Sequence, residues 1–184
     1  MAKVAVFLAN GCEEVEALTP VDILRRGGIE VTVVSITNSL KVEGSHGIRM
    51  EADAVISEMD LAEYDMVVLP GGMPGTRYLE ADARVIDTVK EFAVNPDKYI
   101  AAICAAPTVF GRMGVLMGKK ATCYGGMEAD LLGAEVITDR PVVRDGHIIT
   151  SRGAGTAVDF GLALLEVFTD RETADDMAAK IMFR

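Results

Sequence analysis

The chain has 184 residues, a formal net charge of −10 and a composition that is 50% hydrophobic. This length suits one domain over 1–184 with a full core, and no apolar stretch approaches a membrane span. The acidic charge argues against nucleic acid and membranes as partners. Three widely spaced cysteines without a Cys-x-x-Cys pair indicate free thiols, no metal site and a reduced, cytoplasmic protein.

The first third of the chain alternates apolar runs with one amphipathic stretch. A continuous apolar run predicts a buried strand at 3–9, and acids followed by helical apolar spacing predict a helix at 13–28. Pro20 is awkward there, because proline removes a helical hydrogen bond. A second strand at 30–36 and a hairpin-like excursion at 41–53 follow.

The middle of the chain repeats this alternation. A buried strand at 65–72 ends in a Pro-Gly-Gly turn, and an amphipathic helix follows at 82–95. The apolar run at 99–104 predicts another strand, which leads directly into a helix at 105–114.

The last third predicts shorter elements and a strongly apolar helix. In order they are a strand at 120–124, a short helix at 128–133, a hairpin at 141–151, the apolar helix at 155–168 and a final helix at 171–183. Strands that alternate with helices predict an α/β fold with a parallel sheet covered on both faces. Ligands of such sheets bind at the carboxyl ends of the strands.

Cys104 stands at one of these strand ends, where a strand passes into a helix. Ala102 and Ala106 lie two positions away on either side, which is the small-residue spacing of a nucleophile elbow. The start of the following helix would lower the pKa of the thiol. The alternative, a buried cysteine packed like an alanine, is about equally compatible with the spacing.

Three acids crowd the predicted first turn of the first helix, at Glu13, Glu14 and Glu16. Compensation of the helix dipole explains any one of them. One could instead point inward to Cys104, where enclosure would raise its pKa and allow acid or base chemistry. The turn at 69–75 offers consecutive backbone N–H groups that could bind an oxyanion, although Gly-Gly and Pro-Gly are also ordinary turns.

Three further features favour structural roles. The loop at 151–155 could cradle an anion, but it lacks a phosphate-loop lysine and a dinucleotide-binding spacing. Cys123 lies at a predicted strand end and either packs in the core or faces the same side as Cys104. His147 follows an Asp-Gly turn and is expected to be exposed.

Four motifs in this order carry a resemblance to a known family: GCEEVEALTPVDILRRGGIEVTV, YDMVVLPGGMPG, IAAICAAPTVF and ITSRGAGTAVDFGLALLE. Together they closely resemble the DJ-1/ThiJ/PfpI superfamily, on its DJ-1 and YajL-like branch. The resemblance runs from the first strand to about Phe168. It implies a flavodoxin-like three-layer sandwich with a mainly parallel sheet, usually a homodimer, and no cofactor.

The resemblance also implies roles for particular residues. Cys104 corresponds to the reactive, easily oxidised elbow cysteine, and Glu16 to its buried hydrogen-bonded glutamate. Glu13 and Glu14 are then left with capping roles at the surface. Gly72 and Ala105 correspond to positions whose backbone amides lie beside the thiolate.

Further positions are candidates for lining the site. Arg26 matches an arginine that reaches the partner subunit's site in the family, and Gly71 belongs to the amide turn. Two positions depart from the pattern: Tyr124 stands where relatives carry a histidine, and His46 where many have an arginine. Both departures put a particular substrate chemistry in doubt. The chain also ends early, and we expect the additional C-terminal helix of DJ-1 to be missing.

The resemblance implies a cysteine-dependent, cofactor-free enzyme of the glyoxalase III or protein deglycase type. Its substrate would be the small aldehyde methylglyoxal or its adducts, in carbonyl and oxidative stress. The alternative is a redox sensor or chaperone that works through oxidation of Cys104, which Tyr124 slightly favours. A peptidase of this fold needs a histidine directly after the cysteine, where Ala105 stands. A glutamine amidotransferase needs a His-x-Glu motif, which His147 does not begin.

Overall fold

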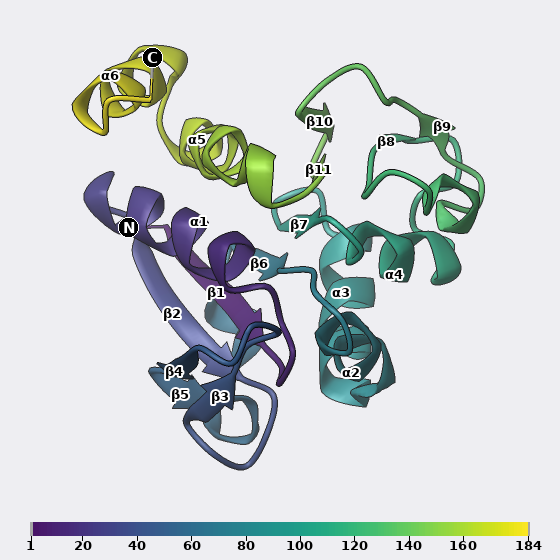
Figure 1. Ribbon diagram of the computed structural model, residues 1–184. Helices are drawn as coiled ribbons and strands as arrows, with labels where there is room; N and C mark the ends of the chain where they lie inside the picture. Colours follow the sequence, from purple (N-terminus) through teal and green to yellow (C-terminus); the bar gives the residue numbers. More distant parts are fainter. Residues whose placement is uncertain (1, 184) are drawn as a thin grey trace.

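The computed structural model describes residues 2–183 and shows a seven-stranded sheet with helices on both faces (Figure 1). The strand order is β10-β11-β7-β6-β1-β2-β5, and only β10 pairs antiparallel, with β11. The predicted flavodoxin-like α/β fold with a mainly parallel sheet is therefore confirmed. The strands of this sheet are β1 (Lys3–Leu8), β2 (Glu30–Ser35), β5 (Ala54–Val55), β6 (Met66–Leu69), β7 (Tyr99–Ile103), β10 (Val142–Asp145) and β11 (Ile148–Ser151).

Six α-helices and four short 3₁₀ helices connect and cover the strands in the described part of the chain. The α-helices are α1 (Glu14–Arg26), α2 (Gly75–Ala81), α3 (Ala83–Val94), α4 (Pro107–Arg112), α5 (Ala157–Phe168) and α6 (Arg171–Lys180). The 3₁₀ helices are η1 (Ile56–Glu58), η2 (Leu61–Glu63), η3 (Glu128–Asp130) and η4 (Ala154–Thr156). Two small two-stranded sheets complete the fold, formed by β3 (Lys41–Glu43) with β4 (Arg49–Glu51) and β8 (Lys120–Ala121) with β9 (Glu135–Val136).

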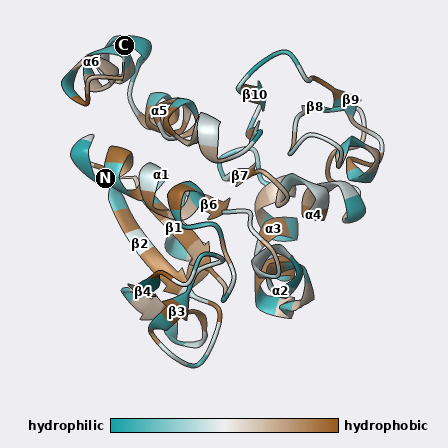
Figure 2. Cartoon of the chain, in the orientation of Figure 1, coloured by the Kyte–Doolittle hydropathy of each residue, from teal (hydrophilic) through white to brown (hydrophobic). Residues whose placement is uncertain are grey.

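The sheet separates two hydrophobic layers. On one face α1 and α5 pack side by side, and their apolar residues join those of β1 and β2 in one core cluster. On the other face α2, α3 and α4 supply the second cluster. Figure 2 shows β1 and β2 as largely hydrophobic, because strands covered on both faces need apolar residues at successive positions.

The differences from the predicted elements are concentrated where turn residues or short strands occur. Helix α2 was not predicted, because the Pro-Gly punctuation before it indicated only a turn. The strand expected at 120–124 is limited to β8, and the helix expected at 128–133 is only η3. Strands β5 and β9 were missed because each has only two residues. Pro20 stays inside α1 without ending it.

The topology brings three loops to one end of the sheet. From β1 the chain moves to β2 on one side and later returns to β6 on the other. Between β1 and β6 the strand order therefore reverses, and such switch points form crevices outside the carboxyl ends of the strands. The loops after β1, β6 and β7 meet there. Across residues 2–183, no helix combines the length and apolar character needed to cross a membrane.

Candidate active site

Cys104 occupies a strained turn directly after β7. Its backbone has φ of 64°, in the left-handed region that residues other than glycine rarely adopt. The turn is held from both sides, because the Cys104 N–H donates to Ser151 O at 3.0 Å and the Cys104 carbonyl accepts from Tyr124 N at 2.8 Å. Ala102 and Ala106 are fully buried, whereas Cys104 itself is half-buried. The thiol thus sits at an elbow with access from outside.

Glu16 reaches this thiol from the first turn of α1. Its side chain is 1% exposed, hydrogen-bonds the Cys104 thiol and accepts the Gly71 N–H at Oε2 with a distance of 3.0 Å. Burial raises the pKa of Glu16 to about 7, with a further rise from the charge of Glu13, although hydrogen bonds from Cys104, Gly71 and Ala154 oppose it. A carboxyl group with this pKa can exchange a proton near neutral pH.

The glycine turn after β6 packs directly against both groups. A Cβ on Gly71 would lie 2.6 Å from Cys104 Cβ and 2.6 Å from Glu16 Oε2, so no larger residue fits. The backbone N–H groups of Gly72 and Ala105 face the sulfur and stabilise its anion. Burial and the charge of Glu16 outweigh them and raise the pKa of the Cys104 thiol. The two groups share a hydrogen bond, so ionisation of one raises the pKa of the other.

Tyr124 lies beside the Cys104–Glu16 pair. Its side chain is exposed, and its N–H is bound to the Cys104 carbonyl. A Cβ on Gly153 would lie 3.6 Å from the Tyr124 ring and 3.8 Å from Glu16 Oε1. The Tyr124 ring and the Glu16 carboxylate therefore both lie next to the backbone of Gly153.

The structure corrects the surface role predicted for Glu14. Its side chain is buried, and it anchors the loop at 44–48 by accepting the His46 N–H at 2.8 Å. His46 Nδ1 lies 2.9 Å from the second carboxylate oxygen. Burial would raise the pKa of Glu14, but the His46 hydrogen bonds prevail and lower it to about 2. Glu13 is the N-cap of α1 and accepts the Glu16 N–H at 2.8 Å.

Two other candidates lie away from the cysteine. His46 is largely exposed and contacts Glu14 rather than the Cys104–Glu16 pair. Arg26 is at the opposite end of α1 from Glu16 and forms an ion pair with Asp22 at 2.7 Å. Its predicted approach to a partner subunit's site stays a prediction.

One group of possible metal ligands occurs among residues 2–183. Glu13, Glu14 and His46 each place a ligand atom within 4.8 Å of the others. The Glu14 oxygens already accept hydrogen bonds from Ser45 and His46, so anchoring of the loop explains this arrangement.

The loop after β11 is the part of the site that sequence reasoning missed. The Ala154 N–H hydrogen-bonds Glu16, whereas the sequence favoured only a structural role for this segment. A signal was available, because β11 is the neighbour of β7 and its carboxyl end had to open at the same crevice.

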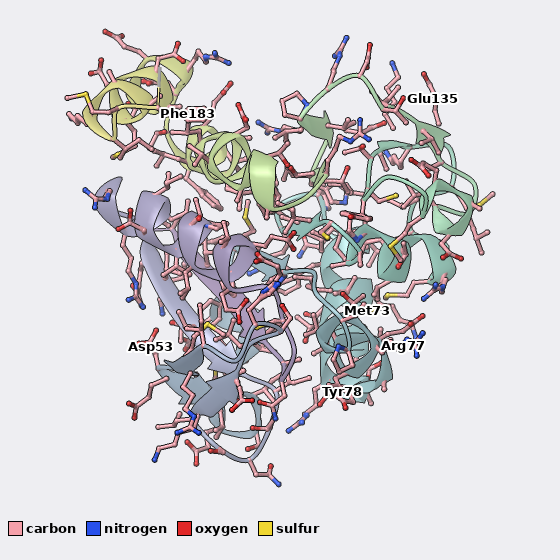
Figure 3. All side chains as sticks on the ribbon, in the orientation of Figure 1. Asp53, Met73, Arg77, Tyr78, Glu135 and Phe183 are labelled. Carbon is pink, nitrogen blue, oxygen red and sulfur yellow. The ribbon has the colours of Figure 1, made fainter. Side chains whose placement is uncertain are left out.

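Other residues considered from the sequence lie elsewhere. Cys123 packs in the core cluster of α3 and α4, while Cys104 contacts the cluster on the other face. His147 is half-buried, contrary to the expected exposure, and its Nε2 lies 2.9 Å from Ala93 O. His147 directly precedes β11, so it lies at the amino end of this strand, whereas the candidate site lies at the carboxyl end. In Figure 3, Met73, Arg77 and Tyr78 project from the turn and helix that follow Gly72.

The arrangement combines three chemical functions. A half-buried thiol can add to a carbonyl carbon, an adjacent carboxyl group can move protons near neutral pH, and two N–H groups can stabilise negative charge. All three converge on one sulfur atom. Such a set suits covalent catalysis on small carbonyl compounds or controlled oxidation of the thiol.

Comparisons with known proteins agree with this geometry. A family model described as the DJ-1/PfpI family matches residues 2–167. Protein dj-1beta of Drosophila melanogaster is 37% identical over 178 residues, covering 96% of this chain and 95% of the relative. Protein DJ-1 homolog B of Arabidopsis thaliana is 37% identical over 99% of this chain, which spans only 42% of that longer relative. The structure of oxidized Toxoplasma gondii DJ-1 superimposes with a TM-score of 0.93 and 35% identity, covering 99% of this chain and 98% of that one.

Proposed function

The chain belongs to the DJ-1/PfpI family, and from this premise we propose that it is a cysteine-dependent, cofactor-free enzyme of the glyoxalase III or protein deglycase type. Its substrate is methylglyoxal or an adduct that methylglyoxal forms, which links the protein to carbonyl and oxidative stress. The observation that carries the proposal is the hydrogen-bonded pair of Cys104 and Glu16, in which burial raises the pKa of the carboxyl group to about 7.

The reaction begins at the sulfur. The Cys104 thiol passes its proton to the Glu16 carboxylate, and its sulfur adds to the aldehyde carbon of methylglyoxal. A C–S bond forms as the C=O π bond breaks, and the carbonyl oxygen takes the proton from Glu16 to give a hemithioacetal. The Gly72 and Ala105 N–H groups stabilise the charge on sulfur before the attack. Because the sulfur is half-buried against Gly71, a compact aldehyde reaches it more readily than a bulky one, which favours methylglyoxal itself over its larger adducts.

Glu16 then moves the protons of the rearrangement. Its carboxylate removes the hydrogen on the former aldehyde carbon, giving an enediol, and returns a proton to the neighbouring carbon. The product is a lactoyl thioester of Cys104, which water hydrolyses to lactate and free thiol. Methylglyoxal and water are consumed and lactate is formed, so oxidation of one carbon balances reduction of the next and no external electron acceptor is needed.

The protein works as a cytoplasmic homodimer in this proposal. Support for a second copy as the partner comes from family membership and from apolar side chains on the outer face of α1, where Val15 is 48% and Leu18 is 42% exposed. Ile48, on the loop that Glu14 anchors to α1, is 54% exposed. Sedimentation equilibrium of wild type and Leu18→Glu tests this, and a monomeric wild type would refute it.

A redox sensor or chaperone is the second candidate function. Two equivalents of peroxide would convert the Cys104 thiolate through a sulfenate to a sulfinate, releasing water at each step. Protonated Glu16 and the Gly72 and Ala105 amides would hydrogen-bond the sulfinate oxygens. Tyr124 favours this candidate slightly, because tyrosine is a poor base near neutral pH.

Lactate formation from methylglyoxal without glutathione distinguishes the two candidates. We expect activity in wild type and its loss in Cys104→Ser and in Glu16→Ala. Cys123→Ser is the matched control, because that thiol lies in the opposite core cluster and the variant should stay active. Equal lactate yields from wild type and Cys104→Ser would refute the enzyme. An inactive wild type with fully reduced Cys104 would favour the sensor.

A further inference from the structure

Two hydroxyl groups beside the candidate site form a network that the proposed chemistry does not use. Ser151 ends β11 and is fully buried, and Thr156 ends η4. Their Oγ and Oγ1 atoms are 2.8 Å apart. Ser151 Oγ also donates to Pro141 O at 2.8 Å. The one proton of the Thr156 hydroxyl is therefore shared between Ser151 Oγ and Gly153 O, which lies 2.9 Å from Thr156 Oγ1.

Thr156 organises the loop in front of it through its side chain. Its Oγ1 accepts the backbone N–H groups of Arg152 at 3.3 Å and Gly153 at 3.1 Å. The Thr156 N–H in turn donates to Gly153 O at 2.8 Å. The oxygen of one side chain therefore satisfies two backbone donors of a loop that contains two glycines and has little side-chain packing of its own.

The same network touches both members of the reactive pair. On one side the Ser151 carbonyl accepts the Cys104 N–H at 3.0 Å, which holds the strained elbow. On the other side the loop presents the Ala154 N–H to the Glu16 carboxylate, and the Gly153 backbone passes close to Glu16 Oε1. Ser151 and Thr156 thus connect the backbone of Cys104 with the loop that presents the Ala154 N–H to Glu16.

We propose that Thr156 is a positioning residue, whose hydroxyl fixes the loop at 152–156 so that the Ala154 N–H is held against the ionised Glu16 carboxylate. The inference rests on the proposed function for its catalytic meaning, but the geometry it describes is independent of turnover. Without the hydroxyl, the Arg152 and Gly153 N–H groups lose their acceptor and the loop is free to move away from Glu16.

The expected consequence is a change in the acidity of Glu16. A donor to the charged form of an acid lowers its pKa, so loss of the Ala154 contact should raise the pKa of Glu16. The other titratable groups that act on Glu16 are Cys104, which hydrogen-bonds it, and Glu13, which repels it. Arg152 directs its guanidinium to the Thr138 carbonyl, so it is not the source of the effect.

The test is a carboxyl ¹³C NMR titration of Glu16 in the reduced full-length protein, with the resonance assigned by its absence in Glu16→Gln. Thr156→Val keeps the shape and removes the hydroxyl, and we expect it to raise the pKa of Glu16 by about one unit. Ala154→Pro deletes the N–H itself and should give a similar rise. Thr156→Ser retains the oxygen and should restore the wild-type value.

Thr169→Val is the matched control. It removes a hydroxyl that donates to Leu165 O at 2.8 Å at the far end of α5, and it should leave the titration unchanged. An unchanged pKa in Thr156→Val, or equal shifts in the valine and serine variants, would overturn the inference. If Thr156→Val does not fold, Thr156→Ala takes its place, because it also removes the hydroxyl that accepts the Arg152 and Gly153 N–H groups, and an unchanged pKa there overturns the inference equally. The titration needs no substrate, so its result is independent of whether lactate is formed.

Discussion

Glu14 and Glu16 lie two residues apart on α1, and their carboxyl groups point to opposite sides of the helix. The two-residue spacing turns the side chains by about 200° around the helix axis. Glu14 binds the loop at 44–48 through His46 and has its pKa lowered to about 2, whereas Glu16 faces Cys104 and has its pKa raised to about 7. One helical turn thus holds an anchor that is charged at neutral pH and a carboxyl group that can exchange its proton.

Glu16→Gln should make the Cys104 thiol more acidic. The negative charge of Glu16 raises the pKa of the thiol, so its removal favours the thiolate at a given pH. We expect iodoacetamide alkylation at pH 7.5 to become roughly three- to tenfold faster, while lactate formation is lost. Glu172→Gln, on the distant α6, is the control. Alkylation that is slower than in wild type would contradict the prediction.

The raised pKa of Glu16 should also appear in the pH dependence of stability. Between pH 4.5 and 7 the folded state keeps a proton that the unfolded chain has released, so the free energy of unfolding falls as pH rises. Glu16→Gln lacks this loss, which is on the order of 3 kcal/mol. In a Cys104→Ser background, urea unfolding should show that the free energy of unfolding of the Glu16→Gln variant rises relative to that of its parent from pH 5 to 8. Parallel pH profiles of the two proteins would rule the effect out.

Glu14→Gln should have the opposite pH behaviour. The lowered pKa of Glu14 stabilises the folded state above pH 4.5, and this stabilisation is lost as pH falls toward 2. The substitution should lower the free energy of unfolding at pH 7 by about 1–3 kcal/mol and cost less at pH 3. Amide exchange at 44–48 should become faster at pH 7. Glu51→Gln, at an exposed position, should change neither quantity, and an equal effect there would argue against the anchor.

Gly71→Ala should disrupt the pair without changing either of its members. The new Cβ would lie 2.6 Å from Cys104 Cβ and 2.9 Å from Ile103 O, and backbone cannot yield as a flexible side chain can. We expect a loss of about 1–3 kcal/mol in the free energy of unfolding and an altered alkylation rate of Cys104. Gly155→Ala, where nothing lies within 4 Å, should be nearly neutral. Equal effects at the two glycines would contradict the close approach.

The strain at Cys104 can be measured by comparing two small substitutions. At φ of 64° an alanine keeps the steric penalty and a glycine removes it, a difference of about 1 kcal/mol. Cys104→Gly should therefore be more stable than Cys104→Ala in urea unfolding. At Ala102, within β7, glycine should instead be destabilising. A less stable glycine variant at position 104 would show that the backbone there is relaxed.

The longer strands and helices could be predicted from the sequence because their patterns are strong. The apolar run of β1 and the helical spacing of α3 mark elements whose burial follows from residue type alone. Helix α2 was missed because Pro74 and Gly75 at its start also mark turns. The two-residue strands β5, β8 and β9 carry too few residues for any periodicity.

The site was accessible to sequence only in part. The small residues around Cys104 suggested an elbow, but the spacing of the three acids left the partner of the thiol open until the family resemblance selected Glu16. The burial of Glu14 could not be read from the sequence, because it depends on a loop more than thirty residues away that supplies His46. Ala154 contributes a backbone N–H, which residue identity does not reveal.

The residues of the candidate site are distant from one another in the chain. Glu16, Gly71, Cys104 and Ala154 come from four segments, and they meet only when β1, β6, β7 and β11 are aligned in one sheet. No single hairpin or helix contains two of them. In a partly assembled chain the Cys104 thiol therefore has the reactivity of a cysteine without these neighbours. The chemical behaviour of Cys104 is therefore a built-in reporter of completed folding: pulsed alkylation during refolding should show its native rate emerging together with the last strand to pair.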